Sequence, residues 1–150
     1  MKTTIMSVLV TITLGLTTAQ ARGNFVVPDQ LKKSIQKEFG RVESVSYYDQ
    51  GNYTMGLFIL DGHQVAAFFE EGGELLGSAR AISTEELPLQ VLKTVKKKFP
   101  AAYLLQSLEI TNKEVTFYSM SVENTSGSYR VNVEPNGYLM NVSSIKIEKQ

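Results

Sequence analysis

Two similar stretches of sequence decide the fold: VPDQLKKSIQKEF at residues 27–39 and LPLQVLKTVKKKF at residues 87–99. With an offset of 60 residues, both place Pro, Gln, Lys and Phe at the same positions. Apolar side chains recur every fourth residue in each stretch, which is typical of one face of an amphipathic helix. Gly40 and Pro100 follow directly and are typical helix terminators. The sequence therefore predicts two amphipathic helices, over 28–39 and 88–99.

Segments typical of β-strands follow each predicted helix. They cover roughly 42–48, 53–60, 63–70 and 74–81 after the first helix, and 102–111, 114–123, 128–134 and 138–147 after the second. Asp61-Gly62 and Asn136-Gly137 supply the positive φ that tight turns need, and such short connections impose antiparallel neighbours. We therefore expect an α+β fold of two tandem repeats, about 25–82 and 83–147. Each repeat would be one helix followed by a four-stranded antiparallel meander, with the helices packed on one face of the sheet. One unit of ~60 residues would be marginal, so we expect the two to share a core or a continuous sheet.

The N-terminus has the three parts of a secretory signal peptide over residues 1–21. Lys2 is the basic start, residues 5–16 are mostly apolar, and Ala19-Gln20-Ala21 is an A-x-A cleavage site. The apolar run is shorter than the ~20 residues that a membrane span needs. We therefore expect an exported mature domain, 22–150, that is periplasmic or extracellular and keeps no stable membrane anchor after cleavage.

No residue pattern in the chain specifies a reaction, a metal site or a cofactor site. The sequence has no cysteine, which excludes thiol catalysis and Cys-ligated zinc. Basic and acidic residues balance at 15 each, so nothing favours a nucleic-acid partner. His63 is the only histidine and follows a turn, so we interpret it as an exposed loop residue. We expect no enzyme activity, no cofactor and no bound metal.

The order of these features resembles the PepSY-like family of exported bacterial proteins, whose fold is similar to that of β-lactamase inhibitor proteins. The resemblance covers essentially all of residues 25–147. The features that carry it are the proline entry into each helix, the closing aromatics Phe39 and Phe99, the Tyr129-Arg130-Val131 strand, and the glycine hairpins at Gly72-Gly73 and Gly137. The resemblance implies an exported, non-enzymatic binding role.

Large apolar residues occur on both alternations of the predicted strands, so the sheet face opposite the helices is also partly apolar. Counting by twos places seven candidate partner-binding residues on that face: Tyr48, Phe58, Phe68, Tyr118, Met120, Arg130 and Asn132. Three explanations compete: the face binds a partner protein, it stacks on the other repeat or on a second subunit, or the chain's own loops cover it.

The leading hypothesis is a binding module that inhibits or regulates an envelope or secreted protein through its sheet face. The alternative is binding of a small apolar ligand in a cavity between the two repeats. A homo-oligomer is compatible with either hypothesis.

Overall fold

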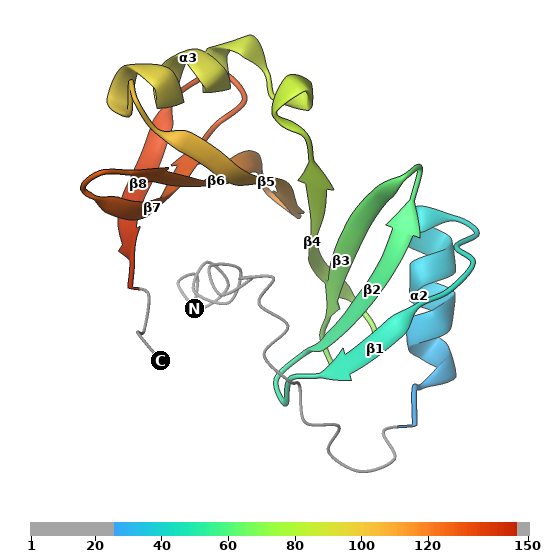
Figure 1. Cartoon of the computed structure of the whole chain (residues 1–150). Coiled ribbons are helices and arrows are strands. Elements are labelled where there is room, and N and C mark those ends of the chain that lie inside the picture. Colours follow the sequence, from blue (N-terminus) through green and yellow to red (C-terminus); the bar gives the residue numbers. More distant parts are fainter. Residues whose placement is uncertain (1–25, 147–150) are drawn as a thin grey trace.

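The computed structural model describes residues 26–146, so the predicted signal peptide at 1–21 lies outside the described residues. The elements, in chain order, are α2 (Asp29–Phe39), β1 (Ser46–Asp49), β2 (Thr54–Leu60), β3 (His63–Phe69), β4 (Leu75–Ile82), the 3-10 helix η2 (Thr84–Glu86), α3 (Leu89–Lys98), β5 (Tyr103–Asn112), β6 (Thr116–Asn124), β7 (Gly127–Val133) and β8 (Leu139–Ile145) (Figure 1). Both predicted helices and all the predicted strand segments are confirmed within a few residues.

The strands form one eight-stranded sheet in the order β1 to β8, and every neighbouring pair is antiparallel. The predicted architecture of two helix-plus-four-strand repeats is therefore wrong, although the fold is α+β overall. The overturning finding is a single eight-stranded sheet with two α-helices in residues 26–146, in which β4 pairs with β5 from Gly77↔Asn112 to Ile82↔Ser107. Two separate meanders would leave the backbone groups of these strands as open edges, and pairing them removes both edges.

The sheet is curved, and α2 and α3 lie on its outer face near opposite ends (Figure 1). Helix α2 buries Leu31 and Ile35 against Phe58 and Phe69, and α3 buries Val91 and Val95 against strands β6 and β7. Full burial of one such side chain stabilises the fold by about 1.5–3 kcal/mol. None of the helices in residues 26–146 is long and apolar enough to cross a membrane.

Each helix also holds a glycine turn of the sheet through a hydroxyl group. The Ser34 hydroxyl donates to the Gly73 carbonyl and the Thr94 hydroxyl donates to the Gly137 carbonyl, both over 2.6 Å. Gly73 and Gly137 have φ values of 82° and 91°, a conformation that side chains disfavour. The β3–β4 and β7–β8 turns are therefore fixed against α2 and α3.

The connector between β4 and α3 contains a capping box. The Ser83 N–H donates to Glu86 Oε2 over 2.7 Å, and the Ser83 side chain accepts from the backbone of Glu86. This box caps η2, and α3 begins only after Pro88. The Ser83–Glu86 motif thus starts a separate 3-10 turn and does not lengthen the second helix.

Candidate functional site: the inner face of the sheet

The face of the sheet opposite the helices, here called the inner face, carries a second apolar cluster. Its buried members are Ala66, Phe68, Ala79, Leu108, Ile110 and Phe117, and its partly buried neighbours are Tyr53, Met55, Leu57, Leu76, Ala81 and Met140. In residues 26–146, no helix lies on this face (Figure 1). Alternation along each strand explains the two clusters, because successive side chains point to opposite faces.

Cross-strand pairing orders these residues into rows. One row runs from Leu57 through Ala66, Ala79 and Ile110 to Phe117, across β2 to β6. This row is entirely apolar. Beside it, the Phe68 ring meets Tyr53 edge to face, with 5.8 Å between the ring centroids. The half of the inner face formed by β2 to β6 is therefore apolar: its central side chains are buried, and Tyr53, Met55, Leu57 and Leu76 are partly exposed.

The next row becomes polar as it crosses into β6, β7 and β8. It runs from Ala81 through Leu108 and Ser119 to Asn132 and Asn141. Asn132 is only 4% exposed, and its Oδ1 atom has no hydrogen-bond partner among the described residues. An unpaired buried acceptor costs about 1–3 kcal/mol.

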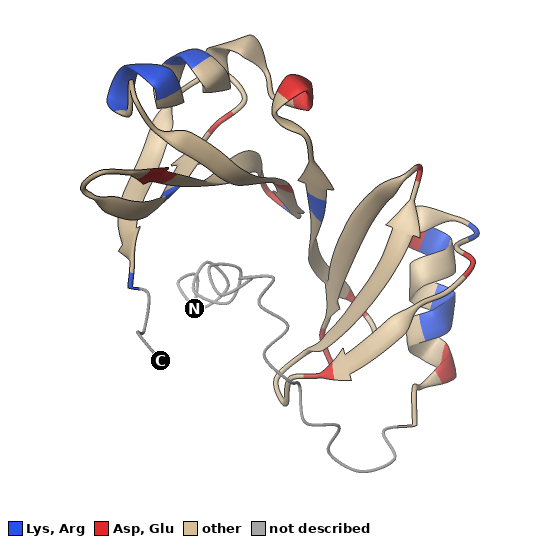
Figure 2. Cartoon of the chain, viewed as in Figure 1, with Lys and Arg blue, Asp and Glu red and all other residues tan. Residues whose placement is uncertain are grey.

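Arg130 lies one row further along the same face, opposite Ser121 and Ser143. Burial lowers the pKa of its guanidinium group from the usual value. Most lysine and arginine residues lie elsewhere, on α2 and α3 of the outer face (Figure 2). The inner face therefore combines an apolar half with a polar half that contains a partly buried cation.

Four of the seven candidate residues from the sequence lie on the inner face: Tyr48, Phe68, Arg130 and Asn132. Tyr48 is opposite Met55 at the β1 end, whereas Arg130 and Asn132 lie on β7. The four residues thus share one face but do not form one contiguous group.

The other three candidates, Phe58, Tyr118 and Met120, lie on the outer face, so their expected placement was wrong. Phe58 packs edge to face on Phe39, with ring centroids 5.1 Å apart, and Met120 is completely buried beneath α3. The cause is register, because a shift of one residue moves a side chain to the other face. Counting by twos within a single strand does not show which of its two sets of alternating side chains packs against α2 and α3.

Sequence reasoning missed the apolar residues of β5 and β2 that form the centre of the inner face. Leu108 and Ile110 alternate with polar residues in β5, and Tyr53, just before β2, alternates with Thr54 and Gly56 along with Met55 and Leu57 of β2. This period-two pattern was the available signal. It could not be assigned to a face before the pairing of β4 with β5 was known.

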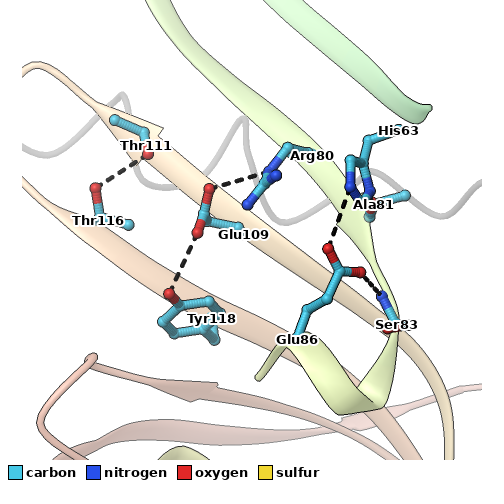
Figure 3. A network of polar contacts seen from close by, with 9 residues as sticks. All are labelled: His63, Arg80, Ala81, Ser83, Glu86, Glu109, Thr111, Thr116 and Tyr118. Atoms are coloured by element: carbon cyan, nitrogen blue, oxygen red, sulfur yellow. Dashed lines mark hydrogen bonds and ion pairs between the residues drawn. The ribbon is translucent and has the colours of Figure 1, made fainter. Parts of the chain in front are cut away.

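His63 is not the exposed loop residue that the sequence predicted. It is the first residue of β3, and its side chain is 24% exposed. Its Nδ1 atom lies 3.0 Å from the Ala81 carbonyl oxygen and its Nε2 atom 3.1 Å from Glu86 Oε1 (Figure 3). Both ring nitrogens thus face acceptors, and only the protonated imidazolium donates to both.

Glu86 joins this histidine to the connector before α3. Hydrogen bonding from the Ser83 backbone is the main cause that lowers the pKa of the Glu86 carboxyl, with smaller contributions from the Ser83 side chain, His63 and Arg80. The cluster therefore ties the start of β3 to η2. Within residues 26–146, no group of three or more potential metal ligands is present.

A second polar cluster lies on the outer face between the two helices. Arg80 Nε donates to Glu109 Oε1 and the Tyr118 hydroxyl donates to Glu109 Oε2, each over 3.2 Å (Figure 3). Burial, and then the charge of Glu109, raise the pKa of Tyr118. These contacts join β4, β5 and β6, the strands at which the two halves of the sheet meet.

The architecture is that of β-lactamase-inhibitor-protein-like (BLIP-like) proteins. A BLIP-like protein from Bacteroides fragilis matches with a TM-score of 0.77 and 14% identity, over 85% of this chain and 92% of that one. A protein predicted to be periplasmic from Bacteroides eggerthii matches with a TM-score of 0.75 and 14% identity, over 81% and 91%. A DUF2874 family protein from Bacteroides uniformis matches with a TM-score of 0.74 and 12% identity, over 79% and 90%.

These similarities show the fold alone, because the sequence identities are low. No protein-family model and no curated protein matches the chain significantly.

Proposed function

We propose that this chain is an exported, non-enzymatic binding module of the PepSY-like type, which binds an envelope protein through its inner face and inhibits or regulates it. Export to the periplasm is supported by the signal-peptide pattern of residues 1–21 and by the likeness to the Bacteroides eggerthii protein. The BLIP-like fold supports a binding role.

The observation that carries this proposal is the apolar half of the inner face, which no helix covers in residues 26–146 and which leaves Tyr53, Met55, Leu57 and Leu76 partly exposed. Protein interfaces commonly combine apolar and aromatic anchors with a few polar groups that set orientation. The matching partner surface has apolar side chains over the partly exposed residues Tyr53, Met55, Leu57 and Leu76.

The structure gives no support, within residues 26–146, to the alternative hypothesis of a small-ligand cavity between the two halves. The halves meet at β4 and β5, which pair directly through their backbones from Gly77 to Ile82.

The test uses the mature chain, residues 22–150, as bait in envelope extract of its source organism. Two inner-face variants are compared with it: Met55→Lys and Leu57→Lys each add a charge at a partly exposed position of the apolar half. The control is Leu89→Lys, because Leu89 is 63% exposed on α3 of the outer face. Thermal unfolding of each variant shows that it is folded.

We expect one protein to be captured by the wild type and by Leu89→Lys and to be lost with both inner-face variants. A captured protein that is retained by both folded inner-face variants would refute the proposed face. The absence of any captured protein would count against the binding function itself.

A further inference from the structure

The two outer edges of the sheet differ in a way that bears on self-association. The β1 edge has only four residues, Ser46–Asp49, and ends at a charged side chain. The β8 edge has seven residues, Leu139–Ile145, with neither charge nor proline. Short and charged edges resist the addition of strands, and long uncharged ones favour it. Within residues 26–146, only the β8 edge is therefore open to another strand.

The side chains of β8 also suit pairing with a second copy. Residues 141–144 are exposed, and Val142, in the middle of the strand, is 36% exposed. Tyr138, just before β8, is 64% exposed. In residues 26–146, β7 is the only strand paired with β8, so the other edge of β8 presents unpaired backbone groups. Since β8 carries no charge, two copies meet without the like-charge repulsion that destabilises cross-strand pairs.

We infer that β8 is a dimerisation strand, which pairs antiparallel with β8 of a second copy about a two-fold axis at Val142. In this register Val142 lies opposite the partner's Val142, and Asn141 lies opposite the partner's Ser143. The contact buries the exposed valine and forms a continuous sheet of sixteen strands, twice the eight of one chain. The axis is perpendicular to the sheet, so both inner faces lie on the same side of the dimer.

This interface is closed, because each copy uses the one open edge of its described sheet, and further growth through the short β1 edge is disfavoured. A contact made by two short strands is at the small end of protein interfaces. We therefore expect a dissociation constant on the order of 10 µM.

The test is sedimentation of the mature chain at protein concentrations from about 1 µM to about 200 µM, which lie below and above the expected dissociation constant. We expect a reversible shift from monomer to dimer, with no larger species. Val142→Lys places two ammonium groups opposite each other and should leave a folded monomer over the same range. Leu89→Lys, which adds the same charge on α3, should dimerise like the wild type.

Cysteine cross-linking tests the register, since the chain has no cysteine of its own. Val142→Cys should form a disulfide-linked dimer under mild oxidation. Ser144→Cys should not, because its copies would be roughly 14 Å apart at 3.4 Å per residue, beyond the reach of a disulfide. A monomeric wild type, dimers that persist in Val142→Lys, equal cross-linking of both cysteines, or growth into polymers would each overturn the inference.

Discussion

The Gly137→Ala substitution tests how firmly the β7–β8 turn is packed on α3. Gly137 has a φ of 91°, and a Cβ atom added there would lie 3.0 Å from the Gln90 carbonyl oxygen, 3.1 Å from Gln90 Cβ and 3.2 Å from Thr94 Oγ1. The carbonyl belongs to the backbone of α3 and cannot rotate away as a flexible side chain could. The new methyl group must therefore push the turn and the helix apart.

Two costs combine in this variant. A non-glycine residue in the left-handed region costs about 1–2 kcal/mol. Overpacking against fixed atoms adds about 1–3 kcal/mol. Displacing the turn also weakens the 2.6 Å hydrogen bond from Thr94 to the Gly137 carbonyl. We therefore expect the free energy of unfolding to fall by about 2–5 kcal/mol.

Gly51→Ala is the matched control for the backbone strain. Gly51 has a similar φ of 84°, but an added Cβ atom would meet nothing within 4 Å. The free energy of unfolding of this variant should fall only by the conformational cost of about 1–2 kcal/mol. The difference between the two variants isolates the contact with α3.

The assay is urea unfolding of residues 22–150 and of both variants, followed by far-UV circular dichroism. The midpoints are compared at equal denaturant slopes, because a changed slope would mean a changed unfolding transition. If Gly137→Ala were no less stable than Gly51→Ala, the turn would not be tightly packed on α3, and the steric argument would be refuted.

Three further predictions concern stability. Thr94→Val removes the hydroxyl donor to Gly137 without changing the shape of the side chain, and should cost about 0.5–1.5 kcal/mol in urea unfolding; an unchanged midpoint would show that the bond contributes nothing. Met120→Ala should cost about 2–5 kcal/mol because its side chain is fully buried. Met140→Ala, at a partly buried position, serves as the control and should cost clearly less. Glu86→Gln should lower stability at neutral pH. Because the folded-state pKa of Glu86 is below its ordinary value of 4.5, the carboxylate stabilises the fold above that ordinary pKa. This contribution is lost as the pH falls through the folded-state pKa, so the wild-type and Glu86→Gln midpoints should converge in acid; a gap independent of pH would contradict it.

The inner face shows how much of the candidate site could be predicted from the sequence. Phe68, Arg130 and Asn132 were assigned to it correctly from alternation alone, whereas Phe58 and Met120 were assigned to it and lie under the helices. Alternation divides the side chains of each strand between two faces but does not show which face packs against the helices. That depends on where α2 and α3 lie, because they cover one face and leave the other uncovered.

His63 shows the same limit for polar residues. Its place after Asp61-Gly62 correctly predicted the start of a strand, but not its contact with Glu86, 23 positions further along the chain. That contact exists because β3 and β4 are paired and the connector after β4 turns back over the start of β3. A local turn pattern has no information about such a neighbour.

The sequence by itself determined the helices, the strands and the turns of this protein. These features depend on near neighbours, since a 3.6-residue period, a two-residue period and a glycine with positive φ are each set by a few adjacent residues. The tertiary structure alone decided that β4 pairs with β5 in one sheet. That pairing is made by backbone N–H and C=O groups, which nearly every residue carries, so no side-chain pattern in the two stretches at 27–39 and 87–99 distinguishes one continuous sheet from two.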